Sequence, residues 1–311
     1  MTETLTSLDG TAASPLAFGA MQFGGRATEA QSQAMFEACL DAGITHFDTA
    51  HVYTGGASER ILGRLIAPHR ARLILATKAG YEGGSSRANI LETFATSQHR
   101  LQMDMVDILY LHRFDEKTGL HETFQTLAEL KQQGKIRYVG VSNFAAWQVI
   151  KAVWVASEFG LTIDILQPMY NLVKRQAEVE LFPACTDQGI AIAPYSPLGG
   201  GLLTGKYAGA ETGRLTEDAR YASRYAPAWM HEAAAGLARI AAELGVHPAT
   251  LAVAWAARHP ARVTPIISAR SPEQLAPSLA ALDHAMEDAL YARLAALSPA
   301  PAPATDRLEE A

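Results

Sequence analysis

The feature of this sequence that most constrains its fold is a regular alternation of short apolar runs with longer segments of helical periodicity. The runs are hydrophobic at nearly every position, which is typical of strands covered on both faces in a parallel sheet. They predict about eight strand–helix units along the chain. We expect strands at Leu16–Gly19, Ile44–Phe47, Leu73–Thr77, Val106–Leu111, Ile136–Val141, Ile163–Leu166, Ile190–Ala193 and Val263–Ile267.

The segments between these runs carry apolar residues at helical spacing. Several end in a glycine just before the next expected strand, namely Gly43, Gly134, Gly160 and Gly189. Glycine is the residue that most readily takes the left-handed conformation that ends a helix. The pattern predicts helices at Glu29–Ala42, Ser58–Ile66, Ala88–Leu101, Leu120–Gln132, Ala145–Ala156 and Val179–Gln188.

Two architectures accommodate repeated strand–helix units, a closed eight-fold barrel and an open doubly wound sheet. An open sheet that binds a dinucleotide would carry a glycine fingerprint after an early strand. The segment after the first expected strand, Met21–Gly25, lacks that fingerprint. We therefore predict an α/β protein with a (β/α)8 TIM barrel, a single domain over about residues 15–297 with a short solvated tail at 298–311.

One segment interrupts the alternation. It runs from Pro194 to about Pro227, is rich in glycine and tyrosine, and follows the seventh expected strand. Long loops inside a compact domain usually serve a function, so we expect this loop to contribute to the site.

Composition and charge argue against several classes of protein. A net charge of −6 without a basic stripe argues against nucleic-acid binding. No stretch approaches the roughly 18 consecutive apolar residues of a membrane span, and Met1–Leu5 shows neither the basic nor the apolar region of a signal peptide. Cys39 and Cys185 lie in apolar helical patterns, which indicates buried thiols. We expect a cytoplasmic protein with no nucleic-acid or membrane partner.

Polar side chains stand where six consecutive expected strands end. Active sites of barrels are built at the carboxyl ends of their strands, so these side chains are the first candidates for chemistry. Each has a plain structural interpretation when taken alone, such as a helix cap or a solvated charge. Their occurrence at one strand end after another favours a shared site. They are Asp48 with Tyr53, Lys78, His112, Ser142 with Asn143, Gln167, and Tyr195.

Four of these residues combine into a proton-transfer site. A phenol has a pKa near 10, and a lysine ammonium close to Tyr53 would lower that pKa. Asp48 would balance the charge of Lys78 in a partly dry barrel mouth. His112 would hydrogen-bond the substrate oxygen or relay the proton. Because none of the four is a hydride source, a reductive reaction would need a cofactor.

In these residues and their order the chain resembles the aldo-keto reductases over nearly its whole length, roughly Leu16 to Leu282. The whole series of motifs, in this order and spacing, is far more specific for the family than any single motif. The motifs are Gly43–Ala50 through Tyr53, Thr77-Lys78, Asp107–His112, Gly134–Phe144, Gln167–Asn171 and Tyr195–Lys206.

The resemblance implies a (β/α)8 barrel and a catalytic tetrad at Asp48, Tyr53, Lys78 and His112. It makes Tyr53 the general acid in reduction and the general base in oxidation. It also implies that the nicotinamide stacks on Tyr195. The carboxamide would be held by Ser142, Asn143 and Gln167, and the pyrophosphate by the backbone of Ser196, Pro197, Leu198, Gly200 and Leu202, with Lys206 close by.

The resemblance extends to the adenosine end of the cofactor, which would contact Ser268, Arg270, Gln274 and Ser278. Arg270 suits a 2′-phosphate, because a guanidinium binds phosphate with two parallel hydrogen bonds. Ser268 and Ser278 depart from the glycine and the asparagine usual in the family. NADP(H) is favoured over NAD(H).

The expected partner is a small carbonyl compound or a sugar. Phe23, Phe114 and Trp147 are candidates for an apolar or sugar-stacking wall, with Tyr81 as a further possibility. All of them have the alternative of ordinary packing. The oligomeric state does not follow from the sequence.

Two other classes of function compete with the reductase. The first is a nucleotide-binding regulatory or redox-sensing subunit with little turnover, of the kind formed by potassium-channel β subunits. The second is a metal-dependent barrel hydrolase or isomerase that would use His46, Asp48, His51 and His112. The His-x-His start and later carboxylates expected of such metal sites are missing from the sequence, so we expect no metal.

Overall fold

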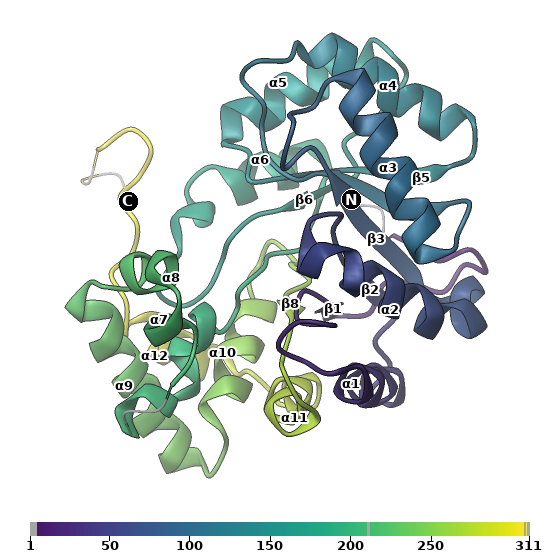
Figure 1. Cartoon of the computed structure of the whole chain (residues 1–311). Coiled ribbons are helices and arrows are strands. Elements are labelled where there is room, and N and C mark those ends of the chain that lie inside the picture. Colours follow the sequence, from purple (N-terminus) through teal and green to yellow (C-terminus); the bar gives the residue numbers. More distant parts are fainter. Residues whose placement is uncertain (1–4, 210–211, 308, 310–311) are drawn as a thin grey trace.

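Eight parallel strands form the centre of the structure, a computed structural model that describes residues 5–209, 212–307 and 309. Neighbouring strands follow the order β7-β6-β5-β4-β3-β2-β1-β8, so each strand pairs with its neighbours along the chain. Figure 1 shows the strands at the centre with helices around them. The strands are β1 (Ala17–Gly19), β2 (His46–Asp48), β3 (Ile74–Ala79), β4 (Val106–Leu111), β5 (Ile136–Ser142), β6 (Ile165–Gln167), β7 (Ala191–Ile192) and β8 (Ile266–Ile267).

Backbone hydrogen bonds close this sheet into a barrel. The amide of Thr264 donates to the carbonyl oxygen of Ile192 at 2.8 Å, and the amide of Ile266 donates to that of Pro194 at 2.8 Å. These bonds join the last strand to the seventh, while β8 also pairs with β1. The predicted (β/α)8 barrel is confirmed.

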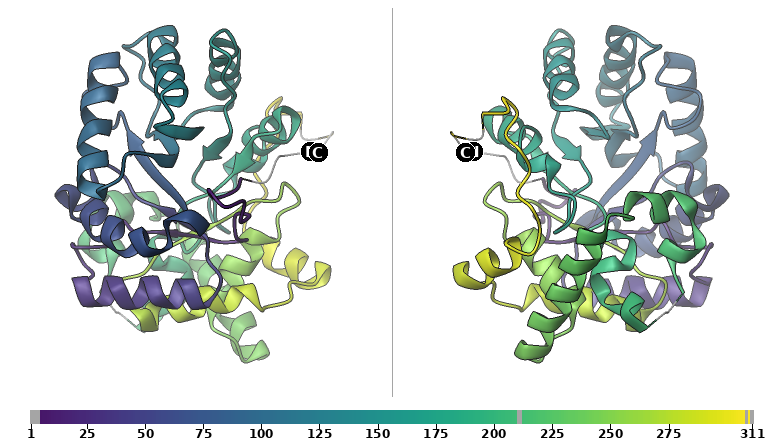
Figure 2. Two further views of the ribbon diagram at one scale, coloured as in Figure 1. Left: turned by 90° about the vertical axis from the view of Figure 1, so that its right-hand side faces the viewer. Right: turned by 90° about the vertical axis from the view of Figure 1, so that its left-hand side faces the viewer.

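Helices surround the strands (Figure 2). The predicted helix at Leu120–Gln132 has the observed bounds, and the other predicted helices agree within two residues. The four glycines expected to end helices all have positive φ angles. The helices are α1 (Glu29–Asp41), α2 (Ala57–Ile66), α3 (Arg87–Leu101), α4 (Leu120–Gln132), α5 (Ala146–Ser157), α6 (Leu181–Gln188), α7 (Arg214–Glu217), α8 (Ala219–Arg224), α9 (Ala228–Leu244), α10 (Pro248–Ala257), α11 (Pro272–Leu279) and α12 (Asp288–Ala295).

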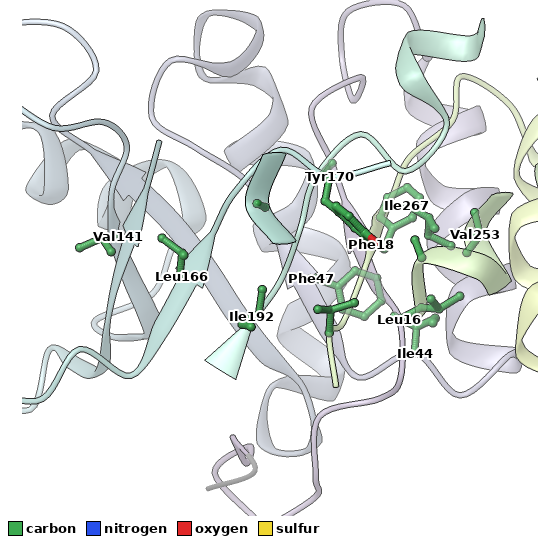
Figure 3. Close-up of a cluster of buried hydrophobic side chains, with 14 of the residues drawn as sticks. Leu16, Phe18, Ile44, Phe47, Val141, Leu166, Tyr170, Ile192, Val253 and Ile267 are labelled. Atoms are coloured by element: carbon green, nitrogen blue, oxygen red, sulfur yellow. The ribbon is translucent and has the colours of Figure 1, made fainter. Parts of the chain in front are cut away.

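Alternate residues of each strand face opposite sides, which separates the core into two layers. The outer layer lies between strands and helices and includes Phe47, Val141 and Leu166, labelled in Figure 3. A second buried cluster fills the barrel and includes Ile74 and Ile108. Towards the carboxyl ends of the strands, the positions that share the inward parity of this second cluster are polar. They are Asp48, Lys78, His112, Ser142, Gln167, Tyr195 and Ser268.

The segment from Pro194 to Pro227, expected as a long loop, is folded into short helical elements. It contains the 3-10 helices Gly199–Thr204 and Lys206–Gly209, followed by α7 and α8. The fully buried Tyr225 anchors the far end of the segment.

Near the C-terminus, Ser298 is buried, and Arg175 donates a hydrogen bond to its hydroxyl at 3.4 Å. The expected tail therefore begins one residue later, at 299, and its residues 299–307 are exposed or half-buried.

Among the described residues no single helix is long and apolar enough to cross a membrane, although the bent pair α9 and α10 passes that test by length and composition.

Helices α2 and α3 pack closely enough to require a glycine at position 63. A Cβ there would lie 2.2 Å from the carbonyl oxygen of Leu101. We expect Gly63→Ser to lower the free energy of unfolding by about 1–3 kcal/mol through this overpacking, as measured by urea denaturation. Gly119→Ser is the matched control, because a Cβ there meets no atom within 4 Å and serine is a good residue at the start of a helix. Equal stability of the two variants would contradict the prediction.

Candidate active site

A buried ion pair lies at the carboxyl ends of β2 and β3. The ammonium of Lys78 contacts the carboxylate of Asp48 and donates a hydrogen bond to the carbonyl oxygen of Thr49 at 2.8 Å. Gln167 on β6 donates to the other carboxylate oxygen of Asp48 at 2.9 Å. Lys78 and Asp48 are only 1% and 3% exposed. A charge pair this deep needs such additional partners to offset its lost hydration.

Tyr53 lies beside this pair. It begins the 3-10 turn Tyr53–Gly56 that follows β2. The nitrogen of Lys78 is 5.1 Å from the centre of the Tyr53 ring, and the ring of His112 meets the Tyr53 ring edge-on at 5.8 Å. The structure therefore brings together the four residues that the sequence placed at separate strand ends.

The pKa of Tyr53 differs from the sequence expectation. Burial, the charge of Asp48 and the nearby Tyr195 and Tyr221 raise this pKa well above its usual value of 10. A lowered pKa was expected from Lys78, but the ammonium is already paired with Asp48. The expectation of a lowered pKa was wrong for this state of the site. The phenol keeps its proton at neutral pH, as a proton donor must.

His112 is neutral at neutral pH. Burial chiefly, then the charges of Lys78 and Arg113, lower the pKa of His112 to about 3. Its Nδ1 atom is buried and has no hydrogen-bond partner among the described residues. A neutral imidazole can orient a substrate oxygen by a hydrogen bond. Relaying a proton would require the imidazolium form, which is unfavourable at neutral pH because the pKa of His112 lies several units below that pH.

The loop that carries Tyr53 is strained and held from two sides. Thr54 has a φ of 47°, and its hydroxyl donates to the carbonyl oxygen of Phe23 at 2.9 Å. On the other side Arg100 of α3 donates to the carbonyl oxygen of His51 at 2.8 Å. Such a backbone persists only where its surroundings hold it.

Arg100 is itself fixed by a buried carboxylate. It pairs with Glu59 at 3.2 Å, and Glu59 accepts a hydrogen bond at 2.7 Å from the hydroxyl of Thr77, the residue before Lys78. This network ties the Tyr53 loop to β3, and the sequence analysis missed it. The available signal was that Glu59 shares a helix face with Leu62 and Ile66, where an acid would be buried and would need a partner.

Polar residues expected at the nicotinamide surround His112. Asn143 donates to the carbonyl oxygen of His112 at 2.9 Å and accepts from the hydroxyl of Tyr195 at 2.7 Å. Ser142 donates to the carbonyl oxygen of Gln167 at 2.9 Å. The structure thus brings Ser142, Asn143, Gln167 and Tyr195 to one side of the tetrad.

The backbone expected at the pyrophosphate requires glycine. Gly200 and Gly201 have φ angles of 67° and 100°. A Cβ at Gly200 would lie 2.7 Å from the ring of Tyr221, and one at Gly201 would lie 3.0 Å from the side chain of Lys206. The turn that holds Ser196, Pro197, Leu198, Gly200 and Leu202 therefore depends on glycine, because another residue would be strained at these φ angles and would crowd Tyr221 or Lys206.

Two hydroxyls at the expected adenosine end lack partners. The Oγ atoms of Ser268 and Ser278 are buried without a hydrogen bond among the described residues. Nearby, Arg270 is half-buried, and no described carboxylate pairs with it. Gln274 is exposed in α11. Buried unsatisfied hydroxyls call for an explanation, and a polar ligand edge supplies one. These residues fit a dinucleotide.

The aromatic residues proposed as a substrate wall do not all reach the site. Phe23 is fully buried in the core against Phe18, so its assignment to the wall was wrong. Phe114 and Trp147 meet edge-on at 5.8 Å, and Trp147 is 61% exposed. Tyr81 comes nearer, with its ring 4.8 Å from that of His112.

A cavity of about 240 Å³ adjoins the tetrad and is lined by Lys78, Tyr81, His51 and Glu82 among others. A larger hollow of about 770 Å³ is lined by residues that precede β4 and β5, such as Asp104 and Lys135. It therefore lies at the opposite end of the barrel from the tetrad. Across the described ranges, no three His, Cys, Asp or Glu side chains are placed to share a metal ion.

Comparison with known proteins agrees with this geometry. Residues 15–299 match the model of the aldo/keto reductase family. The chain belongs to the aldo/keto reductase family. It is 35% identical over 264 residues to a probable voltage-gated potassium channel subunit beta of Arabidopsis thaliana, covering 78% of this chain and 80% of that protein.

Other relatives are named for the carbonyl compounds they reduce or for the family. The chain is 34% identical over 243 residues to an L-glyceraldehyde 3-phosphate reductase of Escherichia coli O157:H7, covering 72% and 70% of the two chains. It is 40% identical over 195 residues to human aldo-keto reductase family 7 member A3, covering 61% and 59%. As an aldo/keto reductase the chain is an oxidoreductase that acts on carbonyl groups.

Arg100 provides a test of how the reductase holds Tyr53. We expect Arg100→Met to lower kcat by about 10–100-fold, because small displacements of a reacting group are costly, while KM for the cofactor changes little. Arg137→Met is the matched control, since Arg137 pairs with the buried Asp107 at 2.8 Å at the start of β5 and β4, the opposite end of the barrel from Tyr53. It should lose stability but keep kcat. Steady-state kinetics on folded protein would refute this role for Arg100 if both variants turned over equally.

Proposed function

We propose that this aldo/keto reductase is an NAD(P)H-dependent enzyme that reversibly reduces an aldehyde, ketone or sugar carbonyl to the alcohol. The observation that carries the proposal is the meeting of a protonated phenol, a neutral imidazole and a buried ion pair at one end of the barrel. Tyr53 holds the proton, His112 faces it, and Lys78 is paired with Asp48.

In reduction, Tyr53 is proposed to donate its proton to the substrate oxygen. The bound nicotinamide supplies the hydride that the carbonyl carbon accepts. The Lys78 ammonium lies 5.1 Å from the centre of the Tyr53 ring, so a positive charge stands beside the phenolate that is left behind. That positive charge limits the cost of phenolate formation. In oxidation the same phenolate would act as the base, and solvent would return or remove the proton.

His112 is proposed to orient the carbonyl oxygen. Its lowered pKa of about 3 makes it a hydrogen-bonding group and not a cation over the working pH range. Because the orientation of the ring depends on the backbone of β4, the hydrogen bond from Asn143 to the His112 carbonyl supports this role.

For the cofactor we propose NADP(H) ahead of NAD(H). Ser142, Asn143, Gln167 and Tyr195 would hold the nicotinamide end, and the turn at 196–202 with Lys206 the pyrophosphate. Ser268, Arg270, Gln274 and Ser278 would hold the adenosine end. The half-buried Arg270 has no described counter-ion, which leaves its guanidinium available for a 2′-phosphate.

A second candidate function is a nucleotide-binding regulatory subunit with little turnover. It is favoured by the 35% identity to a probable potassium channel subunit beta over 78% of this chain. The two candidates differ in turnover with a carbonyl panel, which would be negligible for a regulatory subunit.

Removing the Tyr53 hydroxyl should abolish the chemical step. We expect Tyr53→Phe to lower kcat for NADPH-dependent carbonyl reduction by several orders of magnitude, with cofactor affinity nearly unchanged, because the hydroxyl acts in the transition state. Kinetics and NADPH titration measure the two effects. Undiminished NADPH oxidation in the variant would contradict the proposed mechanism.

Arg270 should distinguish the two nicotinamide cofactors. We expect Arg270→Ala to weaken NADPH by about tenfold or more, the size of a charge-assisted hydrogen bond, and to leave NADH much less affected. Fluorescence titration with each cofactor measures the difference. Equal weakening of both would show that the 2′-phosphate is held elsewhere.

A further inference from the structure

The residue that follows His112 presents a positive charge beside the tetrad. Arg113 is exposed, and its guanidinium lies over the ring of Tyr81 at 4.9 Å. The ring of Tyr81 in turn lies 4.8 Å from that of His112. The Tyr81 ring therefore lies within 5 Å of both the Arg113 guanidinium and the His112 imidazole, which is proposed to orient the carbonyl.

The charge of Arg113 has no counter-ion within the described part of the chain. None of the described carboxylates lies within ion-pair distance of it. Asp115, two residues along, is already occupied, because its carboxylate accepts hydrogen bonds from the Ser85 and Lys117 amides and from the Thr118 hydroxyl. An exposed arginine stacked on an aromatic ring is held in place while its hydrogen-bonding edge stays free.

This charge acts on the site and is not part of a generally basic surface. After burial and Lys78, Arg113 is the third cause that lowers the pKa of His112. The chain as a whole carries a net charge of −6. A cation fixed at the mouth of an acidic protein favours anionic ligands there.

We infer that Arg113, held by Tyr81, is an anion subsite, and that the substrates of this enzyme are carbonyl compounds carrying a carboxylate or a phosphate. The inference rests on the proposed reductase function and names its substrate class. A guanidinium binds either oxyanion with two parallel hydrogen bonds. The exposed ring of Tyr81 would lie along the part of the substrate that joins the anion to the carbonyl.

The first test compares two aldehydes that differ chiefly in charge, 4-carboxybenzaldehyde and its neutral methyl ester, methyl 4-formylbenzoate. The wild type should prefer the carboxylate by about tenfold or more in kcat/KM, mainly through KM, as one charge-assisted hydrogen bond would give. Added salt should reduce the preference. Arg113→Met should abolish it, and Arg113→Lys should retain only part of it.

Arg239→Met is the matched control, because Arg239 is an exposed arginine on α9 and its loss changes the net charge equally. It should keep the wild-type preference. A wild type that does not discriminate the two aldehydes, or a preference lost equally in both methionine variants, would overturn the inference.

A binding measurement separates this inference from the proposed function. Calorimetry with 4-(hydroxymethyl)benzoate in the presence of NADPH measures binding without turnover, because an alcohol and the reduced cofactor cannot react with each other. We expect about tenfold weaker binding to Arg113→Met than to the wild type. Equal affinity, or no binding to the wild type, would refute the anion subsite. If neither aldehyde is reduced but this difference in affinity is found, the proposed reductase function fails and the anion subsite stands.

Discussion

The buried ion pair between Lys78 and Asp48 joins β3 to β2 inside the barrel, and the rest of the candidate site depends on it. Both side chains point inward, Lys78 above the apolar Ile74 and Ala76 of β3 and Asp48 above the buried His46 of β2. Leaving either charge without its partner at this depth would be strongly destabilising. Gln167 and the Thr49 carbonyl complete the coordination of the pair. The pair thus fixes a positive charge next to Tyr53 while keeping the phenol protonated.

Positioning of Tyr53 is a separate problem, because this residue stands on a turn and not on a strand. The turn contains Thr54 at a positive φ and two glycines. Its conformation is held by Thr54 on one side and by Arg100 on the other. Glu59 connects Arg100 to Thr77, the neighbour of Lys78. The proton donor and the ion pair are therefore parts of one rigid arrangement.

Around this arrangement the barrel mouth divides into two sides. The long segment after β7 supplies the glycine turn, and the residues after β8 supply two hydroxyls without a described partner, where we propose that the dinucleotide binds. Tyr81 and Arg113 lie beside His112, where we propose that the substrate binds. In this proposal the cofactor and the small substrate share one end of the barrel and meet at Tyr53.

The sequence by itself determined the barrel, because strand and helix periods and the glycines before the strands are local properties. It also located Asp48, Tyr53, Lys78 and His112, since barrel chemistry lies at strand ends. Only the tertiary structure decided what depends on contacts between distant segments. It placed Phe23 in the core, raised the pKa of Tyr53 through burial and the charge of Asp48, and connected Glu59 to Arg100. Burial and charge pairing arise from packing across strands, and a linear pattern does not specify them.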